Sequence, residues 1–314
     1  MTISSISLCA RVTLDMHSLN NEGAEGNQLQ TRMVHIVDQT GQLAVTNAIS
    51  GDMLKHIQNE NLAQIASEMG LPICSGCKRV NANRINVDRD FFKSIEKLDT
   101  KDNIGTLREL IRYCTVDDLE GILITEGKRS VARKSVIEFG WLVGVPEKTR
   151  TESYFHVKFD AESRSGGSGS EDGSNTGQNI FYRPANSGEY ALVLNVELDR
   201  IGFHDVTREY VLDEAERSKR KRAMLQSILH TFVKLNGAHR NTQHPHMVNM
   251  AGVISVSYNK TPAPTISPLA DGYREEIQAV VQELNRWKGN EINCYKFDSL
   301  SQFARLVTDL AKKL

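Results

Sequence analysis

The sequence predicts an α+β fold built on one sheet with mainly antiparallel strands and large insertions. Three observations support this prediction. Segments that alternate polar and apolar residues, as strands do, occur in neighbouring pairs that short turns can join. Segments with a helical repeat of apolar residues are mixed with them along the chain. No internal repeat interrupts this mixture, which is typical of the α+β class.

The N-terminal elements are expected to be three strands followed by a helix. Residues 6–14 alternate with a period of two, and residues 32–37 and 43–49 resemble the two arms of a hairpin. The Gly- and Asn-rich run at 20–27 between them is expected to be a loop. Ser50 has the character of a helix N-cap, with Asp52 in the first turn after it.

The middle of the chain is less regular. Residues 70–105 give no clear pattern, and a helix is expected at 106–113. Apolar strands are expected at 122–124 and 136–145, on either side of a basic connection.

The strongest change in composition is the tract 161–178, in which ten of 18 residues are Gly or Ser. Such a tract buries too little apolar surface to offset its ordering entropy, so we expect it to be mobile. Strand-like residues 154–159 and 179–182 adjoin it directly. We therefore interpret it as the tip of a long hairpin, with a core strand at 190–198 after it.

The C-terminal part is expected to alternate helices and strands. The clearest helix is 214–235, whose Leu225, Ile228, Leu229 and Phe232 follow the i, i+3, i+4, i+7 pattern. Further elements are expected as a strand at 253–257, a helix at 271–287, a strand at 292–295 and a helix at 299–313.

Composition excludes several classes of protein. The 314 residues contain 38 Lys and Arg against 39 Asp and Glu, for a net charge of -1. That balance excludes a histone-like binder held by bulk charge, but it allows a localised basic groove. We find no apolar run long enough to span a membrane and no signal peptide, and five sparse cysteines fit a reduced, cytoplasmic setting.

Motifs for cofactors and metals are weak. There is neither a GxGxxG motif nor a Walker motif, and the sequence predicts no cofactor. Cys74 and Cys77 form a single CxxC, whereas a closed zinc site needs four ligands. Cys114 and His56 are candidates to complete one, but no spacing shows it. The favoured interpretation is two reduced loop cysteines and no metal site.

Two further groups have candidate chemistry. His239, His244 and His246 form HxxxxHxH, which fits a metal site, an acid–base pair or a polar loop that Gly237 opens as a helix C-cap. Asp15, Glu22 and Glu25 are candidates for phosphodiester cleavage, but we recognise no metal-site spacing and favour turn and surface residues. Donor-rich loops of Arg, Asn, Gln and His suit phosphate or base contacts better than catalysis.

Basic residues are locally concentrated. Residues 125–150 carry six basic against three acidic side chains, and residues 217–222 carry five basic ones within the first turns of the expected helix, which two acids precede. The helix start at Ser50 also directs free N–H groups outward, with Lys55 one turn later, an arrangement that binds phosphate. Each patch alone fits a solvated charged face, but together they favour a reader of nucleic-acid backbone.

Several motifs together resemble a known family. They are SLNNEGAEGN (18–27), AISGDMLKH (48–56), ARKS (132–135), IFYRPANSGEYAL (180–192) and GAHRNTQHPH (237–246). In this order they resemble the DevR-like backbone subunit of Cascade, a RAMP-superfamily protein of the RNA-guided surveillance complexes of type I CRISPR systems. The resemblance extends from Ile6 to about Ser257.

This resemblance implies a right-hand shape. A modified RRM-like (ferredoxin-like) sheet would form the palm from residues 1–49, 121–153 and 191–314, the last including the C-terminal helices. Residues 50–120 would form the fingers. Residues 154–190 would form a thumb hairpin with the mobile tract 161–178 at its tip.

The resemblance also implies a function. Several copies would polymerise along one CRISPR RNA, bind its backbone, kink it at regular intervals and leave the segments between free to pair with target DNA. The partners would be CRISPR RNA, target DNA through that RNA, copies of the chain and other Cascade subunits, with no membrane. The family members that this chain resembles are not catalytic, whereas related type III subunits cut target RNA with an acidic residue. A metal-dependent ribonuclease therefore stays as the alternative, and defence and guided transposition both stay open.

The residues that the resemblance places at the RNA come from four segments. They are Ser50, Gly51, Lys55 and His56 at the helix start, Arg133 and Lys134 in the groove, Phe181, Tyr182 and Arg183 on the thumb, and Gly237, Arg240 and Gln243 in the donor-rich loop. Aromatic and guanidinium planes can stack on bases. Ordinary strand packing is the alternative for the thumb residues.

Overall fold

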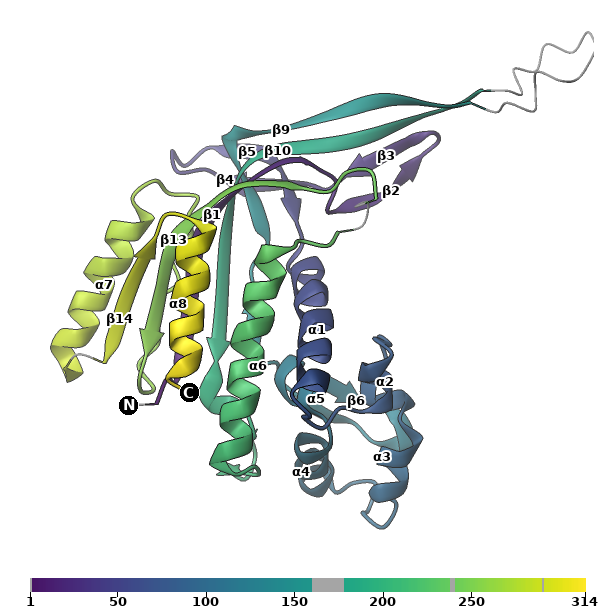
Figure 1. The fold of residues 1–314 in the computed structure, drawn as a ribbon, viewed down its shortest axis with the longest axis vertical. Coiled ribbons are helices and arrows are strands. Elements are labelled where there is room, and N and C mark those ends of the chain that lie inside the picture. Colours follow the sequence, from purple (N-terminus) through teal and green to yellow (C-terminus); the bar gives the residue numbers. More distant parts are fainter. Residues whose placement is uncertain (1, 160–177, 238–240, 290) are drawn as a thin grey trace, which may run out of the picture.

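The computed structural model of the chain describes residues 2–159, 178–237, 241–289 and 291–314. Its centre is a ten-stranded sheet (Figure 1). The strands are β1 (Ser5–His17), β2 (Asn21–Glu25), β3 (Gln28–Thr31), β4 (Met33–Val37), β5 (Leu43–Ile49), β8 (Ile137–Phe139), β9 (Leu142–Phe159), β10 (Gln178–Glu197), β13 (His246–Ser257) and β14 (Ile292–Phe297). The main path runs β14-β13-β1-β10-β9-β5-β4, with antiparallel pairs throughout. The predicted combination of helices with a large antiparallel sheet is confirmed.

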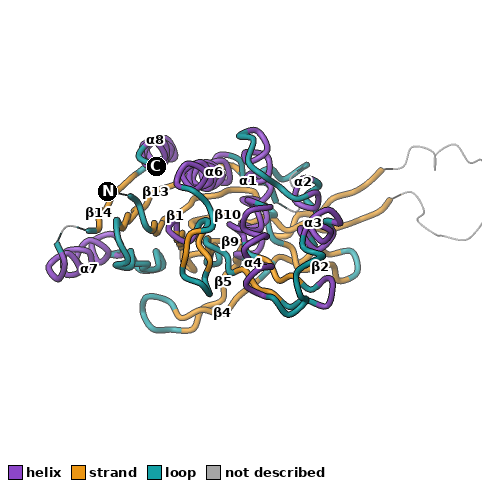
Figure 2. Tube along the Cα trace, turned by 90° about the horizontal axis from the view of Figure 1, so that it is seen from below, coloured by secondary structure: helices purple, strands orange, loops and turns teal. Residues whose placement is uncertain are grey.

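The helices lie on both faces of the sheet and in a separate lobe. They are α1 (Gly51–Glu68), α2 (Ser75–Lys78), α3 (Arg89–Ser94), α4 (Asn103–Tyr113), α5 (Thr115–Glu120), α6 (Glu214–Val233), α7 (Tyr273–Lys288) and α8 (Leu300–Lys312). Short pairs of strands complete the structure, namely β6 (Ile122–Ile124) with β7 (Val131–Arg133) and β11 (Phe203–His204) with β12 (Glu209–Tyr210). Figure 2 shows α1, α6 and α8 on one side of the strands and α7 on the other.

The alternation within β1 explains why helices cover both faces. Leu8, Ala10 and Val12 belong to the main core on the side of α6 and α8, whereas Cys9 packs with Ile277 of α7. Successive side chains of a strand point to opposite faces, so the period of two seen in the sequence becomes two cores. Burying each large apolar side chain contributes about 1.5–3 kcal/mol.

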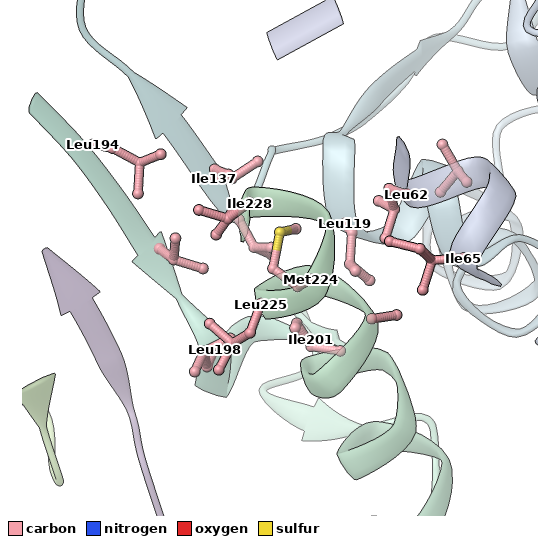
Figure 3. Close-up of a cluster of buried hydrophobic side chains, with 14 of the residues drawn as sticks. Leu62, Ile65, Leu119, Ile137, Leu194, Leu198, Ile201, Met224, Leu225 and Ile228 are labelled. Carbon is pink, nitrogen blue, oxygen red and sulfur yellow. The ribbon is translucent and has the colours of Figure 1, made fainter. Parts of the chain in front are cut away.

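The main core joins the sheet to the lobe that contains α2 to α5. Figure 3 shows side chains of α6, α1, α5 and the neighbouring strands meeting in it, among them Met224, Ile65 and Leu119. Ser50 caps α1 by accepting a hydrogen bond from the backbone N–H of Met53, as the sequence predicts.

The hairpin of β9 and β10 extends from the sheet well past the rest of the molecule (Figure 1). Its strands pair from Val143 opposite Ala191 out to Phe159 opposite Gln178. The prediction that strands flank the Gly/Ser tract as a long hairpin is confirmed. The predicted mobile tip lies outside the described residues, apart from Gln178.

Four local predictions differ from the structure. The 20–27 run is not a loop, because Gly26 and Asn27 form a two-residue turn between β2 and β3, with Gly26 at φ +58°. The strand expected at 136–145 is broken between β8 and β9. The strand expected at 253–257 is the end of the longer β13. Gly237 is not the C-cap of α6, which ends at Val233 with Lys234 as its cap.

None of the helices in the described part of the chain is long and apolar enough to cross a membrane.

Candidate nucleic-acid interface

The hairpin of β9 and β10 carries exposed aromatic and apolar side chains on one face. Phe155 and Tyr182 are cross-strand partners, as are Val157 and Ile180. These side chains are between 38 and 55% exposed, and the rings of Phe155 and Tyr182 meet edge to face at 5.7 Å. Water-exposed rings on a projecting hairpin have no core to fill, so they are available to a ligand with its own planar surface.

The opposite face of the hairpin also carries rings. His156 stacks on Phe181 at 5.5 Å between ring centroids, and the guanidinium of Arg183 lies 4.8 Å from the Phe181 ring. Tyr154 opposite Arg183 is 40% exposed. Planes of this kind, both aromatic and guanidinium, are the groups on which unpaired bases stack.

The donor-rich loop reaches the base of this hairpin. The side-chain amide of Gln243 donates to the carbonyl of Pro184 at 2.9 Å, and the guanidinium of Arg183 donates to the hydroxyl of Thr242 at 3.0 Å. On the other side, the N–H of Tyr182 donates to the carbonyl of Asn27 in the β2–β3 turn. The structure therefore brings together predicted residues of 181–183 and the 237–246 loop.

The segment after β1 links the helix start to the same region. The side chain of Asn20 accepts a hydrogen bond from the N–H of Ser50 at 2.9 Å. Leu19 lies so close to Gly237 that a Cβ there would overlap its side chain. Gly237 thus allows two segments of the chain to approach each other closely. Arg240 lies outside the described residues.

His17, at the end of β1, is a buried, neutral side chain that contacts Tyr190 of β10. Its Nε2 lies 2.9 Å from the hydroxyl of Tyr190, and burial lowers its pKa to about 3. Since the folded state holds the neutral ring, the unfolded state binds the proton first as the pH falls below about 6.5. The contribution of His17 to stability is therefore complete above that pH and is lost as the pH falls towards 3.

A His17→Gln variant tests this linkage. Between pH 7 and 5.5 the free energy of unfolding of the unmodified protein should fall by about 1 kcal/mol more than that of the variant, because only the former takes up this proton on unfolding. Urea unfolding at both pH values measures it. Equal changes in the two proteins would show that His17 is protonated in the folded state.

The start of α1 is less accessible than the sequence predicts. Ser50 is 6% exposed, and a Cβ on Gly51 would lie 2.6 Å from the carbonyl oxygen of Phe139. The exposed side chain of this turn is Asp52, whose negative charge disfavours a phosphate at the start of the helix. Ser50 and Gly51 therefore position the helix against the sheet, and we leave them out of the proposed contacts.

Lys55 and His56 lie one turn later, at a recess of about 240 Å³ that Arg84 and Glu120 also line. The ammonium of Lys55 donates to Ser135 at 2.7 Å and lies 3.9 Å from Glu120. Burial lowers the pKa of Lys55 and raises that of Glu120 to about 7. His56 is largely exposed and pairs with Glu60 at 3.2 Å.

Arg133 and Lys134 have different environments. The Arg133 guanidinium is fully buried and donates to Asp118, Asp205 and backbone carbonyls, whereas Lys134 is exposed. Arg133 therefore lies in the interior and has no exposed donor for RNA, so we leave it out of the proposed contacts as well. Lys134 remains in them.

The basic run at 217–222 is also mostly internal. Arg217, Arg220 and Lys221 are buried and lie within ion-pair distance of Glu214, Asp118 and Asp199. Positions i, i+3 and i+4 share one helix face, and here that face packs inward. The sequence shows which residues are charged, but not whether their side chains point inward or to solvent.

The groups proposed for cleavage do not form a metal site in the described part of the chain. Glu22 pairs with Arg32 at 2.6 Å, and Asp15 lies opposite His246 in the β1–β13 register. Of the described residues, the one group with three or more metal-ligating side chains is Cys74, Cys77, Cys114 and Asp117. Neither Asp15 nor His56 belongs to it, and His239 lies outside the described residues.

Sequence reasoning missed the rings that β9 contributes to the hairpin. Tyr154, Phe155 and His156 were expected only as strand residues, yet they lie directly opposite Phe181, Tyr182 and Arg183. Pairing the two expected strands as a hairpin would have placed them there, because opposite residues share a face. Arg84, at the recess of Lys55, comes from a segment without a sequence signal.

Comparisons with known proteins agree with the resemblance found in the sequence. The sequence model of the family described as CRISPR-associated negative auto-regulator DevR/Csa2 matches residues 8–278. The chain is 24% identical over 297 residues to CRISPR-associated aCascade subunit Cas7/Csa2 2 of Saccharolobus solfataricus, covering 90% of this chain and 88% of that protein. It is 23% identical to CRISPR-associated protein Cas7/Csa2 1 of the same organism, over 73% of this chain and 71% of that one.

Solved structures share the fold. A chain of a CRISPR RNA-guided surveillance complex, pre-nicking, superimposes with a TM-score of 0.54 at 12% sequence identity, covering 98% of this chain and all of that one. A chain of another CRISPR RNA-guided surveillance complex gives a TM-score of 0.53 at 12% identity, over 98% and 99% of the two chains.

Proposed function

The chain belongs to the DevR/Csa2 family of CRISPR-associated proteins, and from this membership we propose that it is a backbone subunit of a type I Cascade. Several copies bind along one CRISPR RNA, kink it at regular intervals and present the segments between for pairing with target DNA. Pairing then reads the sequence, while the protein reads the backbone.

The observation that carries this proposal is the projecting hairpin with rings on both faces. Phe155 and Tyr182 on one face, and His156 and Phe181 on the other, offer stacking surfaces at the base of a hairpin that extends beyond the body. A wedge of this kind can separate neighbouring bases and stack on each, which would kink a single strand.

The hand-shaped division is part of the same proposal. In this proposal the main sheet, an RRM-like sheet in outline, is the palm, the β9–β10 hairpin is the thumb, and the lobe of α2 to α5 forms the fingers. The expected division at residues 50–120 places α1 with the fingers, yet α1 packs on α6 in the core. A boundary after α1 fits the packing better.

Contacts with the RNA backbone in this proposal come from two regions, the recess beside α1 and the projecting part of the hairpin. Lys55 and His56 line the recess, and exposed Lys134 directly precedes Ser135, the hydrogen-bond partner of Lys55. Arg183 lies in β10, and Gln243 bonds the carbonyl of Pro184 in the same strand. Gly237 lets the donor-rich loop pack closely on Leu19. Arg240 of that loop is the last of the proposed RNA contacts.

A neighbouring copy has a suitable surface on the β4–β5 hairpin. Met33, Val37, Leu43 and Val45 share one face by the strand register and are between 47 and 81% exposed. A cluster of exposed apolar side chains on a projecting hairpin is typical of a protein contact. We assign it to the next copy along the RNA.

We propose no catalysis and no cofactor in this function, and a cytoplasmic location. Cutting of complementary RNA at regular intervals by the assembled complex with a divalent metal would instead establish the ribonuclease alternative.

The salt dependence of RNA binding tests the proposed contacts between the protein and the phosphates of the RNA. The proposed contact at Lys134 predicts that Lys134→Gln weakens binding to single-stranded guide RNA and lowers the slope of log Kobs against log salt by about 0.7, the value for one phosphate on a single strand. Lys312→Gln, which removes another exposed charge, from α8, is the matched control and should leave the slope unchanged. An unchanged slope in Lys134→Gln would remove Lys134 from the interface.

A further inference from the structure

Three cysteines and one aspartate from two separate segments meet inside the lobe. Cys74 caps α2 and Cys77 lies within it, while Cys114 joins α4 to α5 and Asp117 lies in α5. All four are buried, and their ligand atoms lie within 4.8 Å of one another. The cluster joins two segments about 40 residues apart in the chain.

The distances match a tetrahedral metal site. Zinc–sulfur bonds of about 2.3 Å and zinc–oxygen bonds of about 2.0–2.2 Å place tetrahedral ligands about 3.8 Å apart for two sulfurs and about 3.5 Å apart for sulfur and oxygen. Here the sulfurs of Cys77 and Cys114 are 3.7 Å apart, and Asp117 Oδ2 lies 3.4 and 3.6 Å from the sulfurs of Cys74 and Cys77.

The surrounding backbone supports thiolates rather than thiols. The N–H groups of Cys77, Cys74 and Asp117 point at sulfur, the first at Cys74 and the other two at Cys114, with distances of 3.3, 3.4 and 3.5 Å. Such donors stabilise negative charge on metal-bound sulfur. Gly76, between the two cysteines of the CxxC, is needed because a Cβ there would overlap the carbonyl of Arg84.

One buried carboxylate oxygen in the cluster has no ordinary partner. Asp117 is fully buried, and its Oδ1 accepts no hydrogen bond from the described residues; Arg84 approaches it only to 3.8 Å. A buried carboxylate beside three cysteines is costly unless a cation compensates it. A divalent ion among the four side chains supplies that charge.

We propose that Cys74, Cys77, Cys114 and Asp117 bind one Zn²⁺ ion as a closed structural site. Three thiolates select a soft divalent metal, and four protein ligands leave no position for a substrate. The ion fixes α2 and its following loop to α5, and thereby fixes Arg84 beside the recess of Lys55. This assignment is independent of the proposed RNA function.

Metal analysis of the purified full-length chain tests the site. Protein prepared without chelators and under reducing conditions should contain about one zinc per chain, and Cys114→Ser should lose it. Cys294→Ser, which removes a cysteine outside the cluster, is the matched control and should keep the metal. Replacement of zinc by Co²⁺ should give the intense visible bands of a tetrahedral site and sulfur-to-metal charge transfer.

The zinc content of the unmodified protein tests the proposed site even if Cys114→Ser does not fold. Less than about a tenth of one zinc per chain, with no uptake of Zn²⁺ or Co²⁺ by the reduced protein, would overturn the proposal. A mass two hydrogens lower without reductant, with a disulfide mapped to these cysteines, would overturn it as well.

Discussion

Replacing Asp118 with alanine is expected to lower the free energy of unfolding by about 3–5 kcal/mol, since it leaves two buried guanidinium groups without their shared carboxylate. Asp118 lies 2.8 Å from Arg133 and 3.0 Å from Arg220, and all three side chains are fully buried. Its Oδ2 also accepts the N–H of Gly202 at 3.0 Å. Urea unfolding at pH 7 measures the loss.

The control for this variant is an exposed ion pair of the same chemistry. Glu283 pairs with Arg286 at 2.9 Å on the surface of α7, and Glu283→Ala should change stability by no more than about 0.5 kcal/mol. A loss below about 1 kcal/mol in Asp118→Ala would show that water or another anion reaches the two guanidinium groups.

Removing both rings from one face of the hairpin is expected to weaken binding of guide RNA between about 5- and 150-fold. Stacking of one base on an aromatic side chain is worth about 1–3 kcal/mol. The double variant Phe155→Ala, Tyr182→Ala removes this surface, and both side chains are more than a third exposed, so the fold should persist. Fluorescence anisotropy with labelled guide RNA and thermal unfolding separate the two effects.

Two controls make this result specific to stacking. Trp287→Ala removes a ring that is 88% exposed on α7, away from the hairpin, and should leave affinity unchanged. Phe155→Tyr keeps the ring and should retain most of the binding. An affinity unchanged by the double variant would exclude this face of the hairpin from the RNA interface.

The balance of charge has a structural explanation. Several of the basic side chains that the sequence concentrates at 125–150 and 217–222 are buried inside the protein. Arg133 and Arg220, for example, both pair with Asp118. The two exposed cations of these runs that lie in β9, Lys148 and Arg150, are paired with Glu189 and Glu152, so we expect stacking to carry a large share of the RNA affinity.

The sequence predicted elements well wherever local chemistry decides them. The period of two in residues 6–14 and the N-cap at Ser50 depend on residues close together in the chain, and both were confirmed. The 20–27 run was misread because Gly and Asn favour both open loops and tight hairpin turns.

The candidate site was predicted only in part because long-range geometry decides it. Nothing near Arg133 in sequence indicates that Asp118 and Asp205 surround it, and Cys114 lies too far from Cys74 for spacing to reveal the cluster. Phe155 and His156 become part of the hairpin's faces only through the register with β10.

The most direct test of the central claim is native mass spectrometry of the purified chain on guide RNAs of increasing length. A backbone subunit predicts that the number of copies bound rises in whole steps as the RNA lengthens by a constant increment. A single copy on every RNA, or no binding at low salt, would contradict the account.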